Sequence, residues 1–341
     1  NSEDNIEEIK RSFYIINDKN GIRWLIENET SLISILNQWK PYKNSSYFFW
    51  KLIILLFWFK ALSIIPISKK KFLMVSKNLI LKKNNNLSIN NFSFVCYVGR
   101  RNKDYQKSTI FVFDKINKKC IFIIKKAITQ KSWEYVLYEY QILKKLEREK
   151  NQFSPRIYNI DYKNCCFSQE YVYGKPSPIN LNFYHYQLLG SLLNRDKFID
   201  FNKFKQEIVE FRLENKNSNN KELNYLINEI KKSLNFSIWK KKVNSVRIHG
   251  DLAPWNLKFS INKDKMIAYD WEESVDSHLP FYDLIFYKKT VRKLLCKNIK
   301  IDIQQYISAL KEKGFILEDK SIHELYTIAK IFVCIKLKTK S

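Results

Sequence analysis

Three oxygen-bearing side chains follow one another at short spacing in the last third of the chain. They are Asp251, Asn256 five residues later and Asp270 fourteen residues beyond that, with short apolar runs between them. Phosphoryl transfer to an alcohol needs a carboxylate near the reacting hydroxyl group and hard oxygen ligands for Mg²⁺. The types and spacing of these three residues suit that chemistry, and the rest of the chain is expected to position them.

A lysine and a glutamate earlier in the chain form a second candidate pair. Lys125 follows an apolar run, and a helical pattern begins soon after it, with Ser132 as the expected N-cap. Glu139 falls on the apolar face of this helix. A carboxylate in an apolar stripe destabilises the fold unless a cation neutralises it, and Lys125 is placed to do so. The alternative interpretation is that Glu139 lies at the edge of the stripe and reaches solvent.

Short β-branched and aromatic runs surround this pair. Three of them are separated by polar, turn-forming segments, which predicts an antiparallel meander over residues 92–98, 109–113 and 120–124. Further strands are expected at residues 21–26, 156–160 and 165–173. The Gly-Lys-Pro-Ser-Pro sequence that begins at Gly174 is the best candidate for a boundary between two lobes.

Beyond Gly174 the pattern is mainly helical. Helices are expected over residues 181–195, 201–213, 219–234, 281–297, 302–313 and 321–337. Short strands are expected at residues 245–249, 256–260 and 266–270. The three oxygen-bearing residues therefore lie in or next to short strands within a helical region.

Taken together, these residues resemble the aminoglycoside phosphotransferase and choline kinase branch of the protein-kinase-like superfamily. The likeness to its catalytic loop and metal-binding signature lies in His249-Gly250-Asp251-Leu252-Ala253-Pro254-Trp255-Asn256 and Asp270-Trp271-Glu272. It extends over about residues 92–290 and includes Lys125, Glu139, a hinge-like segment at 169–174 and a later motif at 280–284.

The resemblance implies an α+β, two-lobed protein-kinase-like fold. The N-lobe would be an antiparallel β-sheet with one long helix, and the C-lobe would be mainly helical. The implied boundaries are residues 1–90 for an N-terminal extension, 91–173 for the N-lobe and 174–341 for the C-lobe.

The same resemblance implies an ATP- and Mg²⁺-dependent kinase. Asp251 would face the acceptor hydroxyl, and Asn256 and Asp270 would hold Mg²⁺. Lys125, held by Glu139, would contact the α and β phosphates. The backbone from Glu170 to Val172 would hydrogen-bond adenine, and His249 would shape the loop.

Lys126 is the alternative phosphate lysine. Strand alternation puts Lys125 and Lys126 on opposite faces. Lys125 is the better choice because it directly follows the apolar run.

Several departures separate this chain from protein kinases. Only Gly99 lies where a GxGxxG loop would be, and Ala253 stands where many protein kinases have a lysine. Twelve residues separate Asp270 from Asp283, too few for a peptide-binding activation segment. The small-molecule branch is therefore favoured. A catalytically inactive binding or scaffold protein is the alternative, although the intact Asp251, Asn256 and Asp270 count against it.

Composition sets the remaining expectations. The 341 residues include 60 Lys and Arg against 34 Asp and Glu, a net charge of +26, which points to an acidic partner. Because the charge is diffuse, specific nucleic-acid binding is not favoured, and much of the lysine can be ordinary solvated surface. The six cysteines show no CxxC pair, which argues against zinc and favours reduced thiols in the cytoplasm.

Residues 47–65 are apolar almost all round, with Lys51 and Lys60 near the two ends of the longest run. A helix buried against the body or a partner and an interfacial membrane helix both fit this pattern; a transmembrane span fits less well, because the run is short. The second interpretation predicts peripheral contact with the inner face of the membrane. It also suits an acceptor at the membrane surface, and the layout of an apolar, basic extension before the kinase lobes resembles kinase homologues associated with bacterial cell-surface glycan synthesis. The acceptor expected from the resemblance is therefore a small molecule or a sugar, such as a cell-surface glycan precursor.

Overall fold

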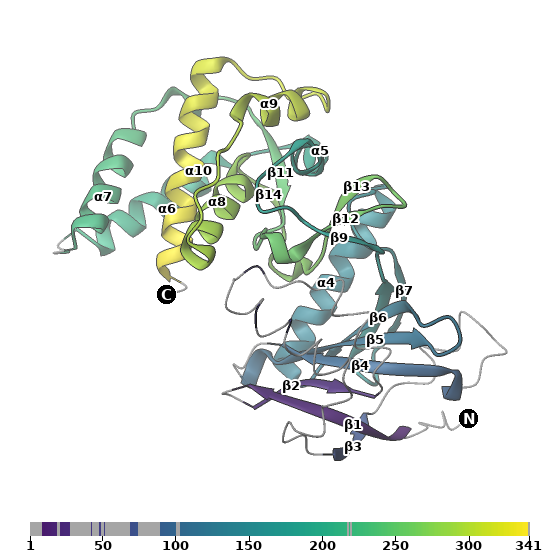
Figure 1. Cartoon of the computed structure of the whole chain (residues 1–341). Coiled ribbons are helices and arrows are strands. Elements are labelled where there is room, and N and C mark those ends of the chain that lie inside the picture. Colours follow the sequence, from purple (N-terminus) through teal and green to yellow (C-terminus); the bar gives the residue numbers. More distant parts are fainter. Residues whose placement is uncertain are drawn as a thin grey trace. The chain divides into compact units, whose positions relative to one another are not determined.

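The structure is a computed structural model that describes residues 9–18, 21–27, 42, 48, 51, 69–73, 89–99, 103–216, 218 and 220–339. The chain forms two compact units (Figure 1). The first unit comprises residues up to 176 together with 258–272, and the second comprises 177–257 and 273–341. The predicted apolar helix at 47–65 lies outside the described residues, apart from Phe48 and Lys51.

An eight-stranded antiparallel sheet is the main element of the first unit (Figure 1), in the order β3-β1-β2-β4-β5-β6-β8-β7. The strands are β1 (Ile9–Asp18), β2 (Gly21–Ile26), β3 (Lys69–Leu73), β4 (Phe92–Val98), β5 (Lys107–Asp114), β6 (Lys119–Ala127), β7 (Ile157–Asp161) and β8 (Cys166–Glu170). The meander predicted from the alternating runs is confirmed as β4, β5 and β6. Strands β1 and β3 were not predicted, and they extend the same sheet beyond β2.

The two faces of the sheet differ in what covers them. One face carries a buried apolar cluster made of Phe13, Phe92, Phe94, Cys96, Ile110, Val112, Phe122, Ile124 and Cys166. On the other face helix α4 (Gln130–Arg148) packs against β6, β7 and β8. Tyr140 of α4 lies 5.7 Å, between ring centroids, from Phe167, which pairs with Lys125 in the sheet. Lys125 therefore belongs to the face that α4 covers.

The start of α4 corrects the sequence analysis. Thr129, not Ser132, is the N-cap, and its hydroxyl accepts a hydrogen bond from the Ser132 backbone N–H. The Ser132 hydroxyl in turn accepts from the Thr129 N–H at 2.9 Å. The motif predicted at Ser132 exists, but Ser132 occupies its third helical position, because a reciprocal capping box satisfies more backbone donors than a single cap does.

A smaller three-stranded sheet, ordered β13-β12-β9, joins distant parts of the chain. Its strands are β9 (Gly174–Pro176), β12 (Leu257–Ser260) and β13 (Lys265–Ala268). Gly174 pairs with Ser260 so closely that a Cβ atom there would lie 1.9 Å from the Phe259 carbonyl oxygen. Only glycine fits this position.

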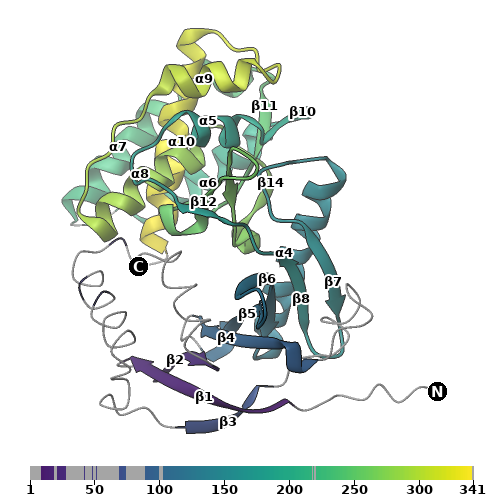
Figure 2. The ribbon, with the colours of Figure 1, turned by 45° about the vertical axis from the view of Figure 1, so that its right-hand side comes forward.

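The second unit is mainly helical, as predicted. Its helices are α5 (Phe183–Gly190), α6 (Phe201–Glu214), α7 (Lys221–Ser233), α8 (Tyr282–Leu295), α9 (Ile303–Lys311) and α10 (Asp319–Thr339). Helix α10 packs against α7 and α8 (Figure 2). Within the described ranges, none of the helices combines the length and the apolarity needed to cross a bilayer.

A three-stranded sheet, β10-β11-β14, accompanies these helices. Its strands are β10 (Leu193–Phe198), β11 (Asn244–Ile248) and β14 (Val275–His278). Strand β11 was predicted, whereas β10 and β14 were not. The helix predicted to run to residue 195 ends at Gly190, and residues 193–195 belong to β10.

Candidate active-site groups in the two units

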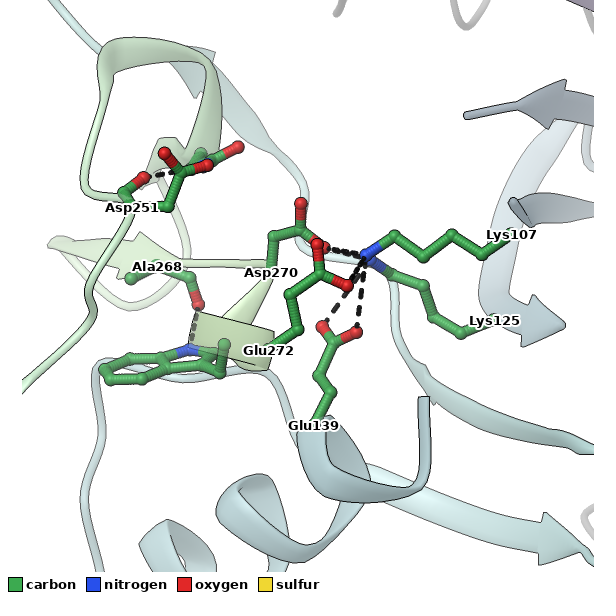
Figure 3. Close-up of polar contacts among 9 residues, drawn as sticks. Lys107, Lys125, Glu139, Asp251, Ala268, Asp270 and Glu272 are labelled. Atoms are coloured by element: carbon green, nitrogen blue, oxygen red, sulfur yellow. Dashed lines mark hydrogen bonds and ion pairs between the residues drawn. The ribbon is translucent and has the colours of Figure 1, made fainter. Parts of the chain in front are cut away.

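A cluster of two lysines and three carboxylates lies in the first unit (Figure 3). Lys107 is the first residue of β5 and Lys125 is near the end of β6, while Glu139 comes from the middle of α4. Asp270 and Glu272 follow β13. The structure thus brings together Lys125, Glu139 and Asp270, which the sequence analysis selected from three separate segments.

Both ammonium groups converge on one carboxylate oxygen. The Nζ atom of Lys125 lies 3.0 Å from Oδ1 of Asp270, and the Nζ atom of Lys107 lies 2.5 Å from the same oxygen. Lys107 also donates to Oε2 of Glu272 at 2.6 Å. With side chains only 8% and 14% exposed for Lys125 and Lys107, these contacts are largely shielded from solvent.

Glu139 is the most deeply buried member of the cluster, with 0% of its surface exposed. Its Oε1 lies 3.5 Å from the Lys125 ammonium, and its Oε2 lies 4.0 Å from that of Lys107. Among the described residues, neither oxygen accepts a hydrogen bond. The alternative in which Glu139 reaches solvent is wrong. Its charge is balanced by ion pairs alone, an arrangement that is costly to break.

The pKa values in the cluster follow from burial and mutual attraction. Burial raises the pKa of Asp270, but the two lysines outweigh this effect and hold it well below its usual range. Burial lowers the pKa of Lys107, yet Asp270, Glu139 and Glu272 outweigh this and raise it. For Glu272, burial and the neighbouring Asp270 raise the pKa. Lys107 and Asp270 are therefore both charged at neutral pH.

Lys107 was missed by the sequence analysis. The signal that could have found it is sheet register, because Thr109 pairs with Lys125, so Lys107, two residues before Thr109, shares its face. Lys126 lies on the opposite face, with Cys96 and Cys166; burial raises the pKa values of both thiols, and the charge of Lys126 only partly opposes this effect. The expected separation of Lys125 and Lys126 by strand alternation is confirmed, and Lys125 is the one that contacts Glu139; its role as the phosphate lysine stays a prediction.

The backbone at Asp270 is unusual. Its φ of 66° is in the left-handed region, which non-glycine residues seldom adopt. The next residue, Trp271, is fully buried, and its indole Nε1 donates to the Ala268 carbonyl at 2.8 Å (Figure 3). Packing of Trp271 thus holds the turn that presents Asp270. Strained residues of this kind cluster at functional sites.

The hinge-like segment of the first unit begins where β8 ends. The Glu170 side chain accepts a hydrogen bond from Lys263 at 2.7 Å and from the Arg156 backbone N–H at 3.1 Å. The backbone of Val172 forms a hydrogen bond with the hydroxyl of Tyr269, a partly buried residue whose pKa burial raises. A ligand that bonds the Val172 backbone at this point would have to displace that hydroxyl.

A third lysine with a largely shielded side chain, Lys258, lies beside the hinge-like segment. The Nζ atom of Lys258 is 4.5 Å from the centroid of the Tyr171 ring, and the residue is 6% exposed. Burial lowers the pKa of Lys258 to about 8. The sequence analysis did not single it out, because a lysine in this Lys-rich chain carries no signal of burial.

Asp251 and Asn256 are neighbours in the second unit. The Asn256 side-chain NH₂ donates to the Asp251 backbone carbonyl at 2.8 Å and to its carboxylate at 3.3 Å. Asn256 ends a short 3₁₀ helix that begins at Pro254. Since both amide hydrogens of Asn256 face Asp251, its amide oxygen points away from that carboxylate.

The loop that presents Asp251 is fixed by Asp283, at the start of α8. The Asp283 carboxylate accepts from the His249 N–H at 2.6 Å and from the Gly250 N–H at 3.0 Å. Burial raises the pKa of Asp283, and His249 and these two N–H groups oppose that effect. Gly250 has φ of +81°, and a Cβ there would lie 2.0 Å from the Glu273 carbonyl oxygen. His249 is fully buried, as a loop-shaping residue would be.

The oxygen ligands selected from the sequence suit a magnesium ion. Asp270 offers a carboxylate that stays ionised, and Asn256 offers an amide oxygen. Across the described parts of the chain, no cluster of three or more His, Cys, Asp or Glu side chains could hold a metal. Mg²⁺ usually takes only one or two protein oxygens and completes its shell with phosphates and water, so each of these oxygens, taken within its own unit, is of a kind that Mg²⁺ uses.

No protein-family model matches this sequence, and no curated protein matches it. Solved structures do. The chain is similar to a macrolide 2′-phosphotransferase from Brachybacterium faecium, with 13% identity, 78% of this chain and 94% of that chain covered, and a TM-score of 0.51. It also matches a type I macrolide 2′-phosphotransferase with 12% identity and a TM-score of 0.49; the match covers 78% of this chain and 92% of that chain. An ethanolamine kinase from Plasmodium vivax matches with 14% identity and a TM-score of 0.45; the match covers 74% of this chain and 78% of that chain.

Proposed function

We propose that this chain, which has the two-lobed α+β, protein-kinase-like fold of the small-molecule phosphotransferases, is an ATP- and Mg²⁺-dependent kinase that phosphorylates a hydroxyl group. The acceptor would be a small molecule or a sugar. The observation that carries the proposal is the buried contact of Lys125 with both Glu139 and Asp270, at 3.5 and 3.0 Å. A scaffold would be more stable with apolar residues at these positions.

Asp251 is the proposed catalytic base. Its carboxylate accepts the proton of the acceptor hydroxyl while the hydroxyl oxygen forms a bond to the γ-phosphorus and the bond to the β,γ-bridging oxygen breaks. The products are a phosphate monoester and ADP. Asn256 orients this carboxylate through its 3.3 Å hydrogen bond, and Asp283 fixes the backbone that carries it.

Asn256 and Asp270 are the proposed metal ligands. Mg²⁺, when bound, supplies positive charge that screens the phosphates and the leaving group. Lys125 would bind the α and β phosphates, with Glu139 setting its position. The backbone from Glu170 to Val172 would hydrogen-bond the adenine ring, once the Tyr269 hydroxyl leaves Val172.

The hydrogen bond between the Val172 backbone and the Tyr269 hydroxyl also favours the alternative, an inactive kinase-like binding protein. In that case the Tyr269 hydroxyl would stay in place and no adenine would bind. Nucleotide binding separates the two functions, since only the kinase proposal requires Tyr269 to move.

The acceptor is proposed from the N-terminal sequence. Residues 47–65, with lysines on both sides, suit a helix at an anionic membrane surface. We place the protein in the cytoplasm, at the inner face of the membrane, with a cell-surface glycan precursor as acceptor.

Transfer of labelled γ-phosphate from ATP to a panel of sugars and amino alcohols tests the proposal. We expect Mg²⁺-dependent transfer to at least one acceptor, and Asp251→Asn should lower kcat by about 10²- to 10⁴-fold with nucleotide affinity unchanged. Asp196→Asn, at an exposed position of β10, is the matched control and should behave as wild type. Equal activity of Asp251→Asn and wild type would refute the role of Asp251.

A further inference from the structure

The cluster of the first unit contains one lysine more than the proposed function uses. Lys107 and Lys125 come from neighbouring antiparallel strands and point to the same place (Figure 3). Their ammonium groups lie 2.5 and 3.0 Å from a single oxygen of Asp270. Two cations so close together and so little exposed repel each other strongly, and only the surrounding acids make the arrangement stable.

Resting on the proposed function, we infer that Lys107 is a second phosphate-binding lysine. It competes with a divalent cation for Asp270 and Glu272. A metal ion held by the Asp270 carboxylate would compete for the oxygen that both lysines share. Each ammonium group then needs another acceptor, and the oxygens of a polyphosphate are strong ones.

The two lysines differ in the acceptor that remains to them. The Lys125 ammonium lies 3.5 Å from Glu139. Since Glu139 accepts no hydrogen bond among the described residues, its carboxylate can accept one from Lys125. Lys107 is 4.0 Å from Glu139 and depends on Glu272 at 2.6 Å. A metal that also engages Glu272 leaves Lys107 without a close carboxylate. Of the two lysines, Lys107 is therefore the one that can more readily bind a phosphate group.

The competing explanation is that Lys107 only neutralises the acids. Then its loss would destabilise the fold but would not depend on how many phosphates the ligand carries. Binding of adenosine and of MgADP separates the two explanations, because adenosine has the same base and sugar and no phosphate.

Two titrations test the inference. Calorimetry measures the binding of MgADP and of adenosine, and electron paramagnetic resonance measures the binding of Mn²⁺ alone. In Lys107→Ala we expect MgADP affinity to fall about 10- to 100-fold and adenosine affinity to stay the same. Mn²⁺ alone should bind more tightly, since a competing cation is gone. Lys107→Arg, which keeps the charge and guards against misfolding, should keep Mn²⁺ binding weak. Lys119→Ala, at an exposed position of β6, is the control.

The outcomes separate the inference from the proposed function. If wild type binds MgADP and Lys107→Ala binds it equally well, the inference is wrong and the proposed function stands. If wild type binds neither MgADP nor adenosine, nucleotide use itself is refuted and the phosphate role of Lys107 falls with it. Unchanged Mn²⁺ affinity in a folded Lys107→Ala protein would overturn the competition with metal.

Discussion

In the described part of the first unit, Lys125 and Lys258 are buried and Lys107 is partly buried, and the surroundings of each lysine decide how much its charge destabilises the fold. Lys107 and Lys125 meet carboxylates, and the acids raise the pKa of Lys107 in spite of its burial. Lys258 meets the face of the Tyr171 ring, and its pKa falls to about 8. A cation on an aromatic face recovers only part of its hydration energy. Lys258 therefore destabilises the native protein when charged.

We predict that Lys258→Met stabilises the protein at pH 7, by at most about 3 kcal/mol in the free energy of unfolding. The unfolded lysine keeps its proton up to about pH 10.4, whereas the folded one loses it near pH 8. Stability of the wild type therefore rises between these pH values, and the advantage of the variant shrinks. Urea unfolding of both proteins at pH 7 and pH 10 measures this. An advantage that does not change with pH would contradict it.

At this scale, the sequence was informative where a residue contradicted its surroundings. Glu139 was found because a carboxylate in an apolar stripe demands a cation, and the cation is present in Lys125. Lys107 did not stand out in this way, because a lysine after a polar turn is ordinary in a chain rich in lysine. Its position depends on the register between β5 and β6, which periodicity within one strand does not determine.

Among the secondary-structure elements, α4 matters most for the cluster, because it alone supplies Glu139. Its first turn is closed by the capping box of Thr129 and Ser132. Fraying of that turn would loosen the helix against β6 and β8 and weaken the placement of the buried carboxylate.

We predict that Thr129→Ala lowers the free energy of unfolding by about 1 kcal/mol, because the Ser132 N–H loses its side-chain acceptor. Thr129→Ser keeps the hydroxyl and should be close to wild type. Urea unfolding followed by circular dichroism tests both variants. Equal losses in the two would show that the hydroxyl is not what stabilises the turn.

Elements with strong periodicity were predicted well, and those stabilised by their partners were not. Helices α6 to α10 repeat apolar residues every three or four positions, which the sequence shows directly. Strand β10 has mostly exposed residues, and β14 has four residues, two of them charged or ionisable. Both exist because β11 lies between them and supplies backbone hydrogen bonds on each side.

At the scale of the whole molecule, the N-terminal part of the chain is divided between the sheet and the proposed membrane segment. Strands β1 to β3 continue the main sheet, and Phe13 belongs to its apolar cluster. Their pairings, such as Ile9 with Leu73, join positions far apart in sequence and therefore leave no local pattern. Removing residues 1–90 would delete β2 and leave one edge of β4 without its partner strand, so substitutions are the better test of residues 47–65.

We predict that the double substitution Leu55→Glu and Trp58→Glu lowers binding to anionic phospholipid vesicles about 100-fold or more, because two apolar side chains leave the interface. Ile116→Glu with Ile316→Glu changes the charge equally at two exposed positions and should bind as wild type. Co-sedimentation measures both. Wild type that stays in the supernatant, or binding unchanged by the first pair, would rule out the membrane role.

The discontinuity of the first unit affects how the protein is made. Its sheet and its two lysines lie before residue 177, but β12, β13, Asp270 and Glu272 come from 258–272. On the ribosome, the nascent chain must therefore grow through residues 177–257 before Lys107 and Lys125 receive two of their three acids. Until then Glu139 alone faces both ammonium groups. Completion of the first unit is thus coupled to synthesis of most of the chain, and a fragment that stops at residue 176 carries both lysines and Glu139 but lacks Asp270 and Glu272.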